Sequence, residues 1–135
     1  VNLLATPLDK AVLEKLNRIK NIALKMQQIL TAPGLGKSDA SRTGLLLDKI
    51  APLFAEEWKA RKALAPGIST PEMDRLIEVA EGALAAKVCG AGGGGCVAFI
   101  VKKGAKDCVT KILNDQGGRV LDFRFVQRGL RVQEI

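Results

Sequence analysis

Glycine dominates the one stretch of the sequence that could do chemistry through its backbone, from Gly90 to Gly95, where only Ala91 interrupts it. A glycine loses more backbone entropy on ordering than an alanine, about 0.5 to 1 kcal/mol each, so this stretch needs a compensating contact. Without Cβ atoms the main chain can approach a phosphate or another backbone closely, and successive N–H groups can form an anion-binding concavity. We therefore predict a backbone contact with an anion or a second domain, and leave open a tight turn that binds nothing.

The glycine loop is predicted to connect two strands. The segment that follows it, Cys96 to Val101, is continuously apolar and contains β-branched residues, which is typical of a buried strand. The Rossmann fingerprint and the Walker A loop both run from a strand into the N-terminus of a helix, and neither spacing is present here. The loop therefore differs from both of these nucleotide-binding motifs.

A second glycine-containing segment, Pro33 to Ser41, only partly imitates a phosphate loop. The Walker A spacing requires a glycine where Thr31 stands, and this segment follows a predicted helix where nucleotide loops follow a strand. A helix end near Gly34 and a new N-cap at Ser38 or Asp39 explain the same residues. The sequence favours an interhelical turn.

The string KVCGAGGGGC, from Lys87 to Cys96, resembles the third motif of the GHMP kinase superfamily, which includes galactokinases, homoserine kinases and mevalonate kinases. Two upstream segments, Glu56 to Ala65 and Gly67 to Pro71, resemble the sugar-kinase branch that contains heptose 7-phosphate kinases, and Gly118 to Val132 resembles the end of that branch. The resemblance covers most of the chain and implies that residues 1–135 form a GHMP kinase C-terminal domain. The implied fold is α+β and ferredoxin-like, with a mainly antiparallel four-stranded sheet covered by helices on one face.

The resemblance also implies a function for a longer protein. Such enzymes transfer the γ-phosphate of ATP to a sugar hydroxyl, and they hold ATP and Mg²⁺ mainly in an N-terminal domain that is not in this chain. The expected partners are that kinase domain and a sugar or sugar-phosphate substrate, with heptose phosphate first. We expect no catalytic residue and no metal ligand in this chain, and no turnover from its 135 residues alone.

By matching position, the resemblance places Gly90, Ala91, Gly92, Gly93 and Gly94 in the lining of the phosphate and substrate cleft. Small residues let a loop press against a phosphate, and backbone N–H groups can stabilise the charge that develops during transfer. These five residues are the principal site prediction.

Three further residues are candidates for the substrate side of the cleft: Lys87, Trp58 and Lys62. Lys87 precedes the loop and could steer a phosphate, with a solvent-facing strand lysine as the alternative. Trp58 is most simply a core anchor whose indole N–H meets a partner, although its charged neighbours leave open a place beside the sugar.

Length and composition indicate one cytoplasmic domain. A chain of this length buries about two thirds of its unfolded surface and needs no covalent staples. Its three cysteines show no Cys-x-x-Cys spacing and it has no histidine, so we expect neither a disulfide framework nor a zinc site. Cys89 and Cys96, which flank the glycine loop, are expected to be small buried apolar residues rather than redox groups.

The formal charge of +7 comes from basic residues spread along the whole chain, with few aromatic residues between them. Nucleic-acid-binding proteins concentrate such charge on one face or interleave it with stacking rings, so we expect no nucleic-acid partner. No apolar run approaches the roughly 20 residues of a membrane span, and we expect no membrane contact. The chain begins at Val1 without an initiator methionine, which suggests a fragment, and a homo-oligomer stays open.

The elements that must position the loop follow from hydrophobic spacing. Helices are expected over about residues 9–30, 40–64, 70–81 and 105–117, and strands over about 85–89, 96–102, 121–125 and 130–133. The predicted buried stripe of the first helix consists of Leu16, Ile19, Ala23, Met26 and Leu30. Pro52 lies inside the second helical pattern, which leaves a kink or break near Ala51 open.

Two rival functions are consistent with the same residues. A self-standing α+β module could bind a small anion through the glycine loop, and it would bind nucleotide or sugar phosphate tightly by itself. A pure interaction domain would bind neither ligand and would expose an apolar face. Calorimetric titration separates these rivals from half of a shared cleft, which binds such ligands weakly.

Overall fold

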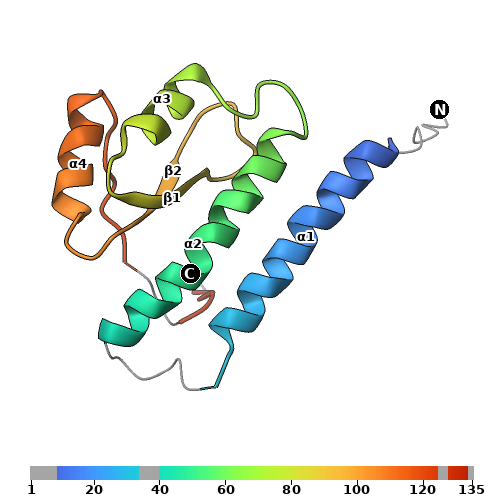
Figure 1. Cartoon of the computed structure of the whole chain (residues 1–135), viewed down its shortest axis with the longest axis horizontal. Coiled ribbons are helices and arrows are strands. Elements are labelled where there is room, and N and C mark those ends of the chain that lie inside the picture. Colours follow the sequence, from blue (N-terminus) through green and yellow to red (C-terminus); the bar gives the residue numbers. More distant parts are fainter. Residues whose placement is uncertain (1–8, 34–39, 125–127, 134–135) are drawn as a thin grey trace.

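Two long helices form the first part of the structure, a computed structural model that describes residues 9–33, 40–124 and 128–133. Helix α1 (Lys10–Leu30) begins where the Asp9 carboxylate accepts a hydrogen bond from the Ala11 N–H at 3.2 Å, as N-cap residues do. Helix α2 (Ala40–Lys62) runs antiparallel beside α1 (Figure 1). The predicted caps at Ser38 and Asp39 lie outside the described residues.

The buried stripe of α1 differs from the prediction. Ile22 is the buried residue of this helix, at 2% exposed, whereas Leu16 and Leu30 are 41% and 53% exposed. The half-buried Lys15 donates from its ammonium group to the Ala63 carbonyl just beyond α2, over 2.6 Å. A lysine can cover apolar surface with its methylene stem while its charge reaches a polar group. A prediction that counts only apolar residues therefore overlooks Lys15 and gives the wrong buried stripe.

Helix α2 continues through Pro52, so the chain does not break at Ala51. Its inward face buries Ile50 and Trp58, as the spacing predicts, together with the small side chains of Ala51 and Ala60. Trp58 is thus a core anchor of this helix.

Helix α3 (Pro71–Val79) begins with a side-chain cap at Thr70. The Thr70 hydroxyl oxygen accepts a hydrogen bond from the Met73 N–H at 3.3 Å, and Pro71 occupies the first turn, where its missing N–H costs nothing. The connection between α2 and α3 lies next to the glycine loop, because the Gly93 N–H donates to the Ile68 carbonyl.

A β-hairpin carries the glycine loop. Strands β1 (Ala83–Val88) and β2 (Val97–Val101) pair antiparallel, with Lys87 opposite Ala98 and Val88 opposite Val97. This confirms the predicted strand-to-strand connection. Helix α4 (Lys106–Asp115) follows β2. Because an isolated two-stranded hairpin is marginal in water, the helices must support it.

Two clusters of buried side chains provide that support. The first consists of Trp58 from α2, Met73 from α3 and Val88 from β1, and the second of Ala80, Val109 and Leu113, with Phe99 and Val101 of β2 packed against it. Each cluster joins the hairpin to at least one helix. The base of the glycine loop is therefore fixed by packing from both strands.

The predicted four-stranded sheet is not confirmed. The described chain forms a two-stranded sheet, and residues 119–124 and 128–133 contain no strand. The described apolar residues of these two expected strands are exposed: Leu121 by 50%, Phe123 by 72%, Leu130 by 94% and Val132 by 83%. Alternation shows that one side of a strand could be buried, but it cannot supply the neighbouring strand that completes the hydrogen-bond ladder. The architecture is α+β with a smaller sheet than expected.

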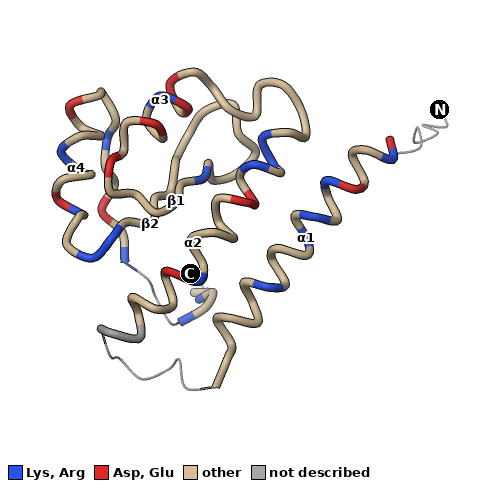
Figure 2. Tube along the Cα trace, in the orientation of Figure 1, with Lys and Arg blue, Asp and Glu red and all other residues tan. Residues whose placement is uncertain are grey.

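Lys and Arg occur on all four described helices and outnumber Asp and Glu most clearly on α1 (Figure 2). This agrees with the spread of charge along the sequence, which carries +7 overall. Within the described residues, no helix is long and apolar enough to cross a bilayer.

Candidate functional site

The glycine loop closes directly on the hairpin. The Cys89 N–H donates to the Cys96 carbonyl at 2.8 Å, which adds one more rung beyond the Val88–Val97 pair. All five glycines of the loop have positive φ, from 73° to 143°. An L side chain rarely adopts this conformation, so the turn itself requires glycine at these positions.

One side of the loop packs against the α2–α3 connection. The Gly93 N–H donates to the Ile68 carbonyl at 3.1 Å. A Cβ built on Gly92 would lie 2.4 Å from that same carbonyl oxygen, a distance that no real Cβ tolerates. At Gly92 the missing side chain is therefore explained by the close approach of two backbones within this domain.

The other side of the loop faces open space. A Cβ on Gly90, Gly94 or Gly95 would meet nothing within 4 Å, and all three residues are exposed. Ala91 is exposed as well. The five residues predicted from the motif thus lie on one turn, with Gly92 half-buried against Ile68 and the other four exposed.

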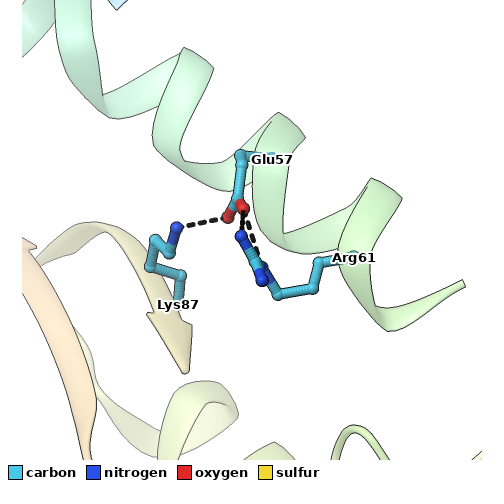
Figure 3. A network of polar contacts seen from close by, with 3 residues as sticks. All are labelled: Glu57, Arg61 and Lys87. Carbon is cyan, nitrogen blue, oxygen red and sulfur yellow. Dashed lines mark hydrogen bonds and ion pairs between the residues drawn. The ribbon is translucent and has the colours of Figure 1, made fainter. Parts of the chain in front are cut away.

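Lys87, the residue before the loop, is held by α2. Its ammonium group lies 2.5 Å from Oε2 of Glu57 and 5.4 Å from the centroid of the Phe54 ring, which adds a cation–π contact. Oε1 of Glu57 accepts from the Arg61 guanidinium through Nε at 2.7 Å and also through Nη2 (Figure 3). One carboxylate therefore ties β1 to α2 at the base of the loop.

The Glu57 carboxylate is buried, with its side chain 6% exposed. Burial raises the pKa of Glu57, but the hydrogen bonds and charges of Arg61 and Lys87 together hold that pKa below its ordinary value of 4.5. Glu57 is thus ionised at neutral pH, and the charge of Lys87 is balanced inside the protein. The i, i+4 spacing of Glu57 and Arg61 indicates that these two side chains can pair on one helix face. Nothing in the sequence pattern indicates that Lys87 joins them.

The other two substrate-side candidates lie elsewhere on α2. Trp58 is 7% exposed and packs in the first core cluster. Lys62 donates to Oδ1 of Asp74 at 2.6 Å, and Ser69 donates to the same oxygen at 2.7 Å. The structure therefore does not gather Lys87, Trp58 and Lys62 into one pocket lining, and it uses all three in contacts within the domain.

The expectation that Cys89 and Cys96 are buried is wrong, because both are exposed. The apolar run suggested a continuation of the core, but β1 ends at Val88 and β2 begins at Val97. Both cysteines lie just beyond the strand ends, where the chain leaves the packed clusters.

The segment that contains the hairpin and its glycine loop matches a known protein family. The family described as GHMP kinases, C terminal, matches residues 32–118, which is more than half of the chain and includes the whole glycine loop. The chain belongs to the GHMP kinase C-terminal family. Helix α1 precedes the matched segment, and residues 119–124 and 128–133, which are exposed, follow it. The matched part of this GHMP domain is thus the part that supports the hairpin.

Curated relatives of the GHMP domain are kinases. A D-glycero-alpha-D-manno-heptose 7-phosphate kinase from Campylobacter jejuni is 29% identical over 91% of this chain and 33% of its own length. A mevalonate kinase from Pyrococcus abyssi is 36% identical over 53% of this chain and 22% of its own length. A galactokinase from Actinobacillus succinogenes is 30% identical over 71% of this chain and 24% of its own length. The chain therefore spans at most about a third of these three relatives, and no solved structure matches it.

Proposed function

We propose that this GHMP domain forms the C-terminal side of the active-site cleft of an ATP-dependent sugar kinase. The observation that carries the proposal is the exposed face of the glycine loop, where Gly90, Gly94 and Gly95 have open space above their main chain. An accessible, bare backbone of this kind can approach a phosphate closely and offer N–H groups to it.

The role of the loop is to position and stabilise charge rather than to react. Phosphoryl transfer is catalysed almost entirely by positioning and electrostatic stabilisation of the phosphoryl oxygens. The rung between Cys89 and Cys96 closes the ends of the turn and the contact from Gly93 to Ile68 holds its middle, so the loop is preorganised. Of the predicted residues Gly90 to Gly94, we assign the phosphate contact to Gly90, Ala91 and Gly94, while Gly92 and Gly93 hold the loop against Ile68. Lys87 anchors the strand that precedes them.

Magnesium is assigned to another part of the kinase. Mg²⁺ would neutralise charge on the ATP phosphates during transfer. Among the described residues, no three His, Cys, Asp or Glu side chains come together as a metal site. From the resemblance to GHMP kinases, we place the metal ligands, the ATP-binding loop and the acceptor-activating group in an N-terminal kinase domain, the partner of this one.

Within the sugar kinases, we propose a heptose 7-phosphate as the first substrate to test. The support is the relative from Campylobacter jejuni, whose similarity extends over 91% of this chain, compared with 71% for the galactokinase and 53% for the mevalonate kinase. A match of that extent includes α1, which lies before the family segment.

The test uses the protein expressed from its complete coding frame and two matched variants. Gly90→Ala places a methyl group on the open face of the loop at φ 79°, and Gly104→Ala makes the same change at φ 81°, also with open space, in the β2–α4 turn. We expect Gly90→Ala to lower kcat for ATP-dependent phosphorylation of heptose 7-phosphate by about tenfold or more, because an exposed phosphate contact is lost. Gly104→Ala should keep kcat within about twofold, since the αL strain is common to both changes.

The 135-residue chain supplies the second arm of the test. In calorimetric titrations it should bind ATP and sugar phosphates only weakly and should show no turnover, because it provides one side of a shared cleft. Tight binding of either ligand by the chain alone would instead identify a self-standing anion-binding module. If the two alanine variants change kcat equally, the glycine loop is not part of the active site.

A further inference from the structure

Cys89 and Cys96 face each other across the base of the glycine loop. They are the next pair of residues after Val88 and Val97 in the antiparallel register, and the Cys89 N–H donates to the Cys96 carbonyl at 2.8 Å. Directly opposed residues in an antiparallel pair project their side chains from the same side of the hairpin. Both thiols are therefore on one side of the loop base, and both are exposed.

The spacing at such a position suits a disulfide. Residues opposed across a hydrogen-bonded antiparallel pair have Cα atoms about 5.5 Å apart. Disulfides join residues whose Cα atoms are usually about 4.4 to 6.8 Å apart. This Cα spacing allows the bond. Because directly opposed Cβ atoms lie about 4.5 to 5.5 Å apart and those of a disulfide about 3.5 to 4.5 Å apart, forming the bond draws the loop ends together.

We propose that Cys89 and Cys96 form a reversible thiol–disulfide site that clamps the glycine loop. Exposure and proximity to a resolving cysteine are features of redox-sensing cysteines, and the pair has both. A transient disulfide of this kind is typical of redox sensing in reducing compartments, where structural disulfides are rare. The site needs no metal ion, since no cluster of three metal-ligating side chains occurs in the described part of the chain.

The oxidation step uses a peroxide as the oxidant. One thiolate attacks a peroxide oxygen, the O–O bond breaks, and a sulfenic acid and hydroxide form. The second thiolate then attacks the sulfenic sulfur, the S–S bond forms and a second hydroxide leaves, so two thiols lose two electrons and the peroxide becomes two waters. A dithiol reductant reverses the change by thiol–disulfide exchange.

The clamp would act on the face that the proposed kinase uses. A bond between the loop ends draws them together and shifts the backbone of Gly90 to Gly95 away from the arrangement that the contacts of Cys89 and Gly93 hold in the reduced chain. This regulatory part rests on the proposed function, whereas the chemistry of the two thiols does not. We expect oxidation to reduce turnover of the complete kinase at least about fivefold and dithiothreitol to restore it.

Peptide mapping tests the chemistry without reference to activity. Trypsin cleaves after Lys87 and Lys102, so Cys89 and Cys96 fall in one peptide and Cys108 in another. After treatment of the folded chain with hydrogen peroxide, we expect the first peptide to be lighter by two hydrogen atoms and to resist alkylation until it is reduced. Cys108→Ser should behave like the wild type, because this exposed cysteine of α4 has no opposed partner in the hairpin register.

Two single variants identify the bond. Cys89→Ser and Cys96→Ser should each leave the remaining loop thiol open to alkylation or over-oxidation, with an unchanged circular dichroism spectrum, since both positions are exposed. The proposal is overturned if Cys89 and Cys96 are alkylated as readily as Cys108 after peroxide, or if they form disulfides with Cys108 or between chains. A disulfide that forms in a protein without kinase activity would leave the thiol site standing and refute the proposed function, so the two failures are distinguishable.

Discussion

At the scale of single residues, the glycines of the loop are required for different reasons. Gly92 lies against the Ile68 carbonyl, where a Cβ would be 2.4 Å from the oxygen, whereas Gly90 has nothing within 4 Å. Both have similar positive φ values, 90° and 79°. The first glycine allows packing inside the domain, and the second allows the shape of an exposed turn whose main chain stays open to a ligand.

This difference predicts the effect of two alanine substitutions on stability. Gly92→Ala should lower the free energy of unfolding by about 1 to 3 kcal/mol more than Gly90→Ala, because both pay the same αL strain and only Gly92→Ala adds a backbone clash. Urea denaturation of both variants measures the difference. Equal midpoints would show that the loop does not pack on the α2–α3 connection.

The ionisation of Glu57 predicts how the stability of the domain depends on pH. Because its folded pKa lies below the ordinary value of 4.5, the unfolded chain takes up a proton first as the pH falls. The stabilisation by Glu57 is therefore complete at neutral pH, begins to decline near pH 4.5 and is lost as the pH passes through the folded pKa.

Glu57→Gln should lower the free energy of unfolding at pH 7 by on the order of 3 kcal/mol, since it leaves Lys87 and Arg61 beside a neutral group. The variant should also lose stability less steeply than the wild type below pH 4.5. Glu56→Gln is the matched control: its partner Arg18 is 58% exposed, and such surface pairs contribute less than about 1 kcal/mol. Thermal unfolding as a function of pH measures both effects, and parallel pH profiles for Glu57→Gln and the wild type would contradict the assignment.

At the scale of elements, α3 depends on one side-chain cap. The Thr70 hydroxyl oxygen accepts from the Met73 N–H, and Met73 in turn packs in the first core cluster with Trp58 and Val88. Loss of the cap would therefore loosen the helix that closes one side of the hairpin.

Thr70→Ala should cost about 1 kcal/mol of unfolding free energy, whereas Thr70→Ser should cost only a few tenths, because serine keeps the oxygen that accepts the bond. Chemical denaturation of the pair provides the measurement. If serine and alanine destabilise equally, the methyl group of Thr70 and not its hydroxyl oxygen supports the helix.

Local signals were readable in the sequence, and non-local ones were not. Thr70 and Pro71 predict the start of α3, and the glycine loop between two apolar runs predicts a hairpin. The contact between Gly92 and Ile68, the pairing of Lys87 with Glu57, and the place of Lys15 in the α1 stripe join residues that are distant in the chain. The same limit explains the missing strands: alternation over 121–125 describes one segment, while a sheet needs two.

At the scale of the whole molecule, helix α1 is joined to the described chain mainly through α2. It lies beside α2 and outside the matched segment 32–118, and Ile22 is its buried residue. Its ties to the rest include Lys15 to Ala63 and the exposed pair of Arg18 and Glu56. The two core clusters, by contrast, join α2, α3, α4 and the hairpin without α1.

This asymmetry predicts that α1 opens before the rest of the domain. In native-state hydrogen exchange, amides of α1 should exchange through a local opening, while amides near Val88, Val109 and Leu113 exchange only on global unfolding. Ile22→Ala should speed exchange within α1 by about tenfold or more and leave α4 unchanged, because the lost side chain is the apolar anchor of this helix alone. Leu24→Ala, at a position that is 46% exposed, is the matched control and should change neither helix. Exchange of α1 and α4 at one common rate, slowed or accelerated together by Ile22→Ala, would show instead that α1 folds as part of the core.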